Sequence, residues 1–94
     1  MAVGLLLVDC FIPLSQSLKD KRRVLSSVTQ RLRHNYNIAV CEVESQDQWQ
    51  RSRLAVVTVN TQWPMAEHQL QRITEFLEEN RELQVLDCEL RQLD

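Results

Sequence analysis

Basic side chains gather in one short segment of the sequence. Lys19, Lys21, Arg22 and Arg23 place four positive charges within five residues. A cluster of this kind can bind anions, including the phosphates of a nucleic acid. It can equally be a solvated surface whose long side chains cover apolar neighbours. Under the first interpretation, these four residues and Arg51 form a candidate site for RNA or another anion.

A second unusual segment holds a tryptophan among glutamines, between Ser45 and Ser52. A tryptophan in such a turn could stack on a base or anchor a protein partner, while the glutamines bond to polar edges. It could also fold over the edge of a sheet as a lid, because large aromatic side chains are usually mostly buried. In that case Arg51 would pair with Asp47. The candidate partner-binding residues are Gln46, Asp47, Trp49 and Gln50.

The net charge of −2 conceals an uneven distribution. Residues 1–35 carry six basic and two acidic side chains, a net charge of +4, whereas residues 36–94 carry five basic and eleven acidic ones, a net charge of −6. The total alone would argue against a nucleic-acid partner. The local cluster of positive charge removes that objection.

Cysteine and histidine give no sign of a metal site or of a disulfide framework. Cys10, Cys41 and Cys88 are odd in number, far apart, and set within apolar alternations. We therefore expect three small, buried, reduced thiols. His34 and His68 lack a cysteine or acidic neighbour at ligand spacing, so no metal and no cofactor is expected.

Hydrophobic periodicity predicts six elements in the order β-α-β-β-α-β. Ser17 can cap a helix with Asp20 three residues later, and Pro64 suits the first turn of a second helix. Apolar residues recur at helical spacing after both points. The expected strands cover residues 2–12, 37–45, 52–61 and 84–93.

This order is the split βαβ pattern of a ferredoxin-like α+β sandwich. We expect one domain over residues 1–94, in which both helices cover one face of a four-stranded antiparallel sheet with strand order 4-1-3-2. This topology brings the basic start of the first helix and the 46–51 hairpin to one end of the domain. Trp63 lies at the opposite end, where it can fix the second helix to the core.

The uncovered face of this sheet is unusually apolar. In the first strand Leu5 and Leu7 alternate with other apolar residues, and Leu54 and Val56 do so in the third strand, whereas a solvated face should be polar. These four residues form a candidate face for a homodimer. The alternative is partial cover of the patch by long side chains, namely those of Glu42, Glu44, Glu89 and Arg91.

Three segments together resemble the YlxP-like family of small uncharacterised bacterial proteins. They are SLKDKRRVL from Ser17, VESQDQWQRSRLAV from Val43 and ELQVLDCEL from Glu82. The resemblance implies a ferredoxin-like fold and a bacterial, cytoplasmic protein. Family genes often lie near those for translation initiation and ribosome maturation factors, which implies RNA or a ribosomal particle as partner. The longest apolar run, residues 2–8, is too short to span a membrane.

Three functions remain open at this point. The favoured one is a non-enzymatic protein that binds RNA or a ribosomal particle through the basic helix start and the adjacent hairpin. The alternative is a protein-interaction module anchored by Trp49. An acylphosphatase-like enzyme shares the fold, but the glycine-rich phosphate loop of that family has no counterpart between Ile12 and Arg23, since Gly4 is the only glycine.

Overall fold

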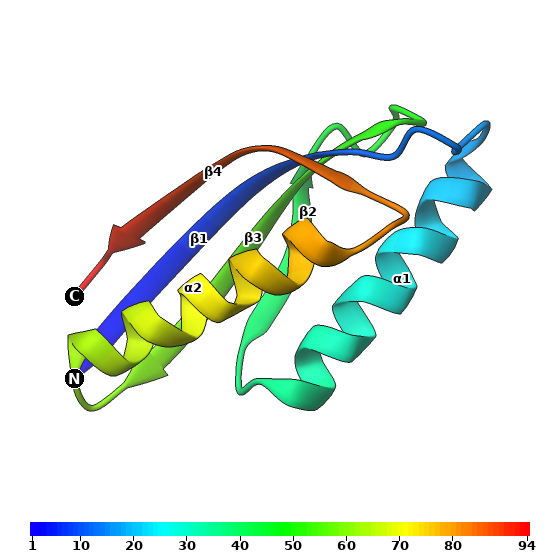
Figure 1. Ribbon diagram of the computed structural model, residues 1–94. Coiled ribbons are helices and arrows are strands. Elements are labelled where there is room, and N and C mark those ends of the chain that lie inside the picture. Colours follow the sequence, from blue (N-terminus) through cyan, green and yellow to red (C-terminus); the bar gives the residue numbers. More distant parts are fainter.

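Six elements follow the predicted order in the computed structural model, which describes residues 1–94. The four strands form one antiparallel sheet with the order β2-β3-β1-β4, which confirms the ferredoxin-like topology expected from the sequence. Both helices lie on the same side of this sheet (Figure 1). No helix is both long and apolar enough to cross a membrane. The elements are β1 (Ala2–Phe11), α1 (Leu18–Asn35), β2 (Ala39–Glu44), β3 (Arg51–Asn60), α2 (Trp63–Glu79) and β4 (Gln84–Gln92).

Two hydrogen bonds form the predicted cap at the start of α1. Ser17 Oγ accepts a hydrogen bond from the Asp20 backbone N–H at 3.0 Å. The Asp20 carboxylate in turn accepts one from the Gln16 backbone N–H at 2.9 Å. These bonds satisfy backbone donors that have no partner inside the helix, and they fix where α1 begins.

The core lies between the sheet and the helices and is built from alternate residues of the strands. Leu54 and Val56 of β3 belong to it and are 1% and 0% exposed. They therefore cannot be part of an open dimer face, and this part of the prediction is wrong. The β1–β3 register shows the reason, because it pairs Leu5 with Val57 and Leu7 with Ala55. Paired residues share a face, so the open face of β3 carries the other parity.

The single glycine serves a close approach between β1 and α2. A Cβ atom at Gly4 would lie 2.8 Å from Leu70 Cδ1 and 3.2 Å from the Trp63 ring. The missing side chain thus makes room for α2 to pack against the sheet through these two residues. Trp63 holds the start of α2 at the end of the domain away from the hairpin, as predicted.

Two of the three cysteines differ from the prediction. Cys10 is buried, but Cys41 and Cys88 are exposed. Both lie on edge strands, which have a neighbouring strand on one side only. A shift of register in β4 pairs Cys88 with Val8 and Val85 with Cys10, and leaves Leu86 unpaired and exposed. An extra residue of this kind is a β-bulge, and the strict alternation predicted for β4 ends there.

Candidate functional site

The β1–α1 connection and the β2–β3 hairpin lie side by side at one end of the domain (Figure 1). Two hydrogen bonds join them. The Ile12 backbone N–H donates to the Gln50 carbonyl at 2.8 Å, and Gln50 Nε2 donates to the Pro13 carbonyl at 3.0 Å. This arrangement confirms that the basic helix start and the polar hairpin share one end. We call it the hairpin end, comprising residues 13–23 and 45–51.

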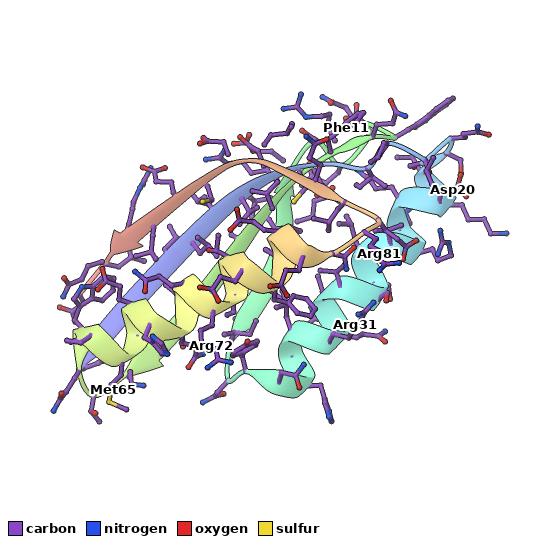
Figure 2. All side chains as sticks on the ribbon, in the orientation of Figure 1. Phe11, Asp20, Arg31, Met65, Arg72 and Arg81 are labelled. Atoms are coloured by element: carbon purple, nitrogen blue, oxygen red, sulfur yellow. The ribbon has the colours of Figure 1, made fainter.

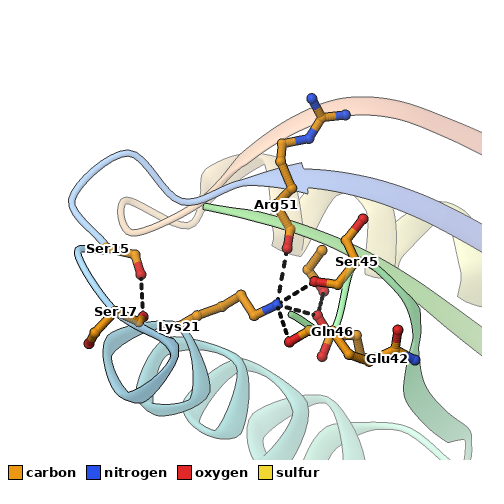
Figure 3. Close-up of polar contacts among 8 residues, drawn as sticks. Ser15, Ser17, Lys21, Glu42, Ser45, Gln46 and Arg51 are labelled. Atoms are coloured by element: carbon orange, nitrogen blue, oxygen red, sulfur yellow. Dashed lines mark hydrogen bonds and ion pairs between the residues drawn. The ribbon is translucent and has the colours of Figure 1, made fainter. Parts of the chain in front are cut away.

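Lys21 is the centre of the hairpin end, although it is only 1% exposed. Its Nζ donates to Glu42 Oε2 at 2.9 Å and to the Ser45 carbonyl at 2.7 Å. The carbonyls of Gln46 and Arg51 lie within 3.3 and 3.2 Å of the same nitrogen (Figure 3). Because its three donors are already engaged, Lys21 cannot bind a phosphate. Its prediction as an RNA-binding cation is wrong.

Lys21 instead holds both ends of the hairpin loop against α1. Three of its four acceptors are backbone carbonyls of the loop, and the fourth, Glu42, also accepts a hydrogen bond from Ser52 Oγ at 2.7 Å. Ser45 has a positive φ of 67°, a conformation unfavourable for a residue other than glycine. The bond from Lys21 to the Ser45 carbonyl helps to hold that turn. We call this arrangement the Lys21 clamp.

The other cations of the hairpin end point to solvent. Lys19, Arg22 and Arg51 are exposed, and no acidic side chain lies within ion-pairing distance of them. The Arg51 guanidinium points away from the clamp, although its carbonyl belongs to it (Figure 3). Arg23 lies 3.3 Å from Glu82, but both side chains are well exposed, so the pair contributes little.

Trp49 is exposed rather than folded over the sheet. Its exposed fraction is 57%, which excludes the predicted lid. The predicted ion pair between Arg51 and Asp47 is not formed either. Instead, Trp49 lines a shallow depression between the hairpin and the β1–α1 connection. The residues around this depression are Ser15, Gln16, Gln48, Trp49, Gln50 and Arg51.

Positive charge continues along α1, beyond the segment singled out in the sequence. Arg31 and Arg33 are exposed, and α1 holds a single acidic residue, the capping Asp20. Figure 2 shows Arg31 on α1, with Asp20 at the hairpin end and Arg72 on α2. The sequence interpretation missed this extension because seven residues separate the two basic groups. Arg31 is eight positions after Arg23, a little more than two helical turns, and both side chains line one depression on the helix surface.

No group of three histidine, cysteine, aspartate or glutamate side chains is placed to hold a metal ion. The hairpin end presents exposed cations, amide groups, the Asp47 carboxylate and one indole ring.

Comparison with known proteins places this arrangement in a family. The family model described as "Protein of unknown function (DUF503)" matches residues 3–90. The chain belongs to the DUF503 family. It is also 30% identical over 82 residues to the "Uncharacterized protein YlxP" of Bacillus subtilis (strain 168), a match that covers 87% of this chain and 89% of that protein. The resemblance to YlxP-like proteins inferred from three short segments is thus confirmed.

The match to DUF503 includes both halves of the hairpin end, because residues 13–23 and 45–51 lie within residues 3–90. Neither description assigns an activity to the family or to the relative. No residue role is therefore carried over from them. The functional argument rests on the geometry of the hairpin end.

Proposed function

We propose that the protein binds an unpaired segment of RNA, free or on a ribosomal particle, at the hairpin end. The observation that carries this proposal is the exposed indole ring of Trp49, presented on a loop whose backbone the Lys21 clamp holds in place. Sequence-specific and sequence-tolerant RNA binding both rely on aromatic side chains that stack on unpaired bases. The glutamines beside Trp49 supply donors and acceptors for base edges.

The clamp supports a role for Trp49 in binding rather than in folding. An exposed tryptophan leaves a large apolar surface in water, which contributes nothing to the stability of the isolated domain. A loop that is held before binding loses less conformational entropy when a ligand docks on it. An exposed aromatic side chain on a loop whose two ends are held in place is suited to serve as a stacking platform.

The surrounding charge fits a phosphate backbone of modest length. Lys19, Arg22 and Arg51 are free to pair with phosphates, whereas the N-terminus of α1 is already capped by Ser17 and Asp20. Three to four contacts with single-stranded RNA predict a slope of about −2 to −3 for log K against log salt. Binding should therefore be weak at physiological salt and strong at low salt.

The test measures the fluorescence anisotropy of a dye-labelled, unstructured RNA oligonucleotide at low salt. Stacking contributes about 1–3 kcal/mol per base, so Trp49→Ala should weaken binding about five- to 150-fold. The double variant Lys19→Glu/Arg22→Glu should lower both the affinity and the salt slope. Arg72→Glu, an exposed arginine on α2, is the matched control and should bind like the wild type. Equal affinity of all four proteins would refute the proposal.

A protein partner at the same depression is the second candidate. Tryptophan and arginine are the residue types that most often dominate protein interfaces, and Trp49 and Arg51 line one depression here. Affinity capture from a native lysate, with and without ribonuclease, separates the two candidates. A partner that is lost in Trp49→Ala and survives ribonuclease would replace RNA with a protein as the ligand.

A further inference from the structure

The face of the sheet opposite the helices is apolar along its two central strands. The β1–β3 register places three pairs of apolar residues there, with Val59 the most exposed at 56%. No helix covers this face (Figure 1). We call these residues the open-face patch: Val3, Leu5 and Leu7 of β1, and Ala55, Val57 and Val59 of β3.

The neighbouring strands extend the patch on one side and border it on the other. Ala39 and Cys41 of β2 are paired with Val57 and Ala55, so small side chains continue the apolar surface. On β4, Glu89 is paired with Leu7 and Arg91 with Leu5. These two charged residues form the polar rim. The predicted cover by Glu42 is not possible, since its register partner is the buried Leu54.

The charges around the patch are already paired within one chain. Arg91 Nε lies 2.9 Å from Glu89 Oε1, and Arg53 Nη1 lies 2.9 Å from Asp9 Oδ1. Arg91 holds the pKa of Glu89 below its usual range through their hydrogen bond. A partner that covers the patch therefore meets no unpaired charge at its rim, and it needs no charge of its own to complement.

These charges favour a second copy of the chain on this face rather than on another. Two copies meeting through α1 would bring basic surfaces together, and two copies meeting through α2 would bring together Glu67, Glu75, Glu78 and Glu79. At the open-face patch, by contrast, apolar surface meets apolar surface. Because the hydrophobic effect is not directional, such a patch is complementary to itself across a two-fold axis.

The full outline of a face along the molecule is close in size to one side of a standard interface. The molecule is 42 Å long and its shorter dimensions are 21 and 17 Å, so this outline measures about 700 to 900 Å². A standard interface buries about 800 Å² on each partner, so a dimer would use nearly the whole face, with the patch at its centre and the paired charges at its rim. We propose that two copies of the chain associate face to face through the open-face patch. This proposal is independent of RNA binding, which is proposed for the hairpin end.

Sedimentation equilibrium from one to several hundred micromolar tests the proposal. The wild type should be a dimer at the upper concentrations. Val57→Glu places a charge in the centre of the patch and should raise the dissociation constant at least 100-fold. Gln30→Glu adds the same charge to the exposed surface of α1 and should leave the dimer unchanged. A wild type that stays monomeric throughout, or a folded Val57→Glu protein that still dimerises, would overturn the proposal.

The native cysteines provide a second test of the dimer that needs no variant. This test still applies if the Val57→Glu protein does not fold. Cys41 lies beside the patch by register, whereas Cys88 is paired with the core residue Val8 and is exposed on the helix side. Dimerisation should slow the alkylation of Cys41 as protein concentration rises and leave Cys88 unaffected. Mass spectrometry after a brief alkylation measures both sites. Equal change, or no change, at the two thiols would overturn the proposal.

Discussion

Replacing Lys21 by methionine tests whether the clamp holds the hairpin end together. Methionine keeps the length of the side chain and removes its charge and all its donors. The change leaves the Glu42 carboxylate and the carbonyls of Ser45, Gln46 and Arg51 without their present partner.

The expected loss of stability follows from these contacts. Removing one partner of a buried ion pair costs about 3–5 kcal/mol, because the other charge stays behind unpaired. Glu42 is 20% exposed and keeps its bond from Ser52, so partial rehydration places the cost of Lys21→Met at the lower end, about 3 kcal/mol. For a domain of this size, this loss corresponds to a Tm about 12–24 °C lower. Adding Glu42→Gln should recover part of it, since no charge then remains unpaired.

Urea denaturation followed by circular dichroism gives the free energy of unfolding of each variant. Lys19→Met is the matched control, because Lys19 lies two residues away on the same helix and is exposed. It should change the stability by less than about 0.5 kcal/mol. Limited proteolysis should also cut the segment 45–51 faster in Lys21→Met than in the control. The reasoning would be refuted if the two variants were equally stable and equally resistant.

Three further changes test other parts of the structure. Gly4→Ala places a Cβ 2.8 Å from Leu70 Cδ1 and should destabilise the fold by about 1–2 kcal/mol in urea denaturation; a stability equal to the wild type would contradict the packing described. Ser17→Ala removes the α1 cap and should cost about 1 kcal/mol, and an unchanged midpoint would show that the cap contributes nothing. Burial is the main cause that raises the pKa of Cys10 from 9.0 to about 12, and the charge of Asp9 is the second. The neutral thiol therefore contributes its full stabilisation of the fold below pH 9, and this contribution is lost as the pH rises toward 12. The stability difference between wild type and Cys10→Ala should therefore shrink by about 1.4 kcal/mol between pH 7 and pH 10, and a constant difference would contradict it.

The sequence predicted the fold well because strong local signals agree with one another. The cap at Ser17, the proline at the start of α2 and the alternation of the strands each mark a boundary, and together they define one topology. The boundaries of the elements lie within about two residues of those expected. The strand order followed from the handedness of the crossovers rather than from any single residue.

The sequence pattern does not show which face of β3 is buried, because both parities of the strand contain apolar residues and the buried one also contains polar residues. The buried parity has Ser52 and Thr58 at its ends, and such polar residues are typical of a solvent-exposed face. The open parity contains the apolar residues Ala55 and Val57. Both buried hydroxyls have partners in the structure: Ser52 donates to Glu42, and Thr58 donates to the Asn37 carbonyl. Polar residues are acceptable in a core once their hydrogen bonds are satisfied, and those partners come from other elements.

The clamp could have been found by combining two positions that were treated separately. Lys21 falls on the apolar stripe of α1, three residues after Leu18 and four before Leu25, and Glu42 has the inward parity of Val40. Opposite charges at two core positions indicate a buried pair, because neither would be tolerated alone. The contacts from Lys21 to the loop carbonyls could not have been predicted in this way, since the sequence contains no signal for which backbone oxygen points inward.

The clamp changes how the basic cluster in the sequence should be understood. One of its four charges is structural, and of the other three, Lys19 and Arg22 have no acidic partner whereas Arg23 lies beside Glu82. The structural lysine is also what fixes the hairpin that presents Trp49 beside the exposed Arg51. Charge and aromatic surface therefore come from two segments that the buried Lys21 ammonium group helps to join. A variant that removes Lys21 should weaken ligand binding through the loss of loop order, whereas one that removes Arg22 should do so with the fold intact.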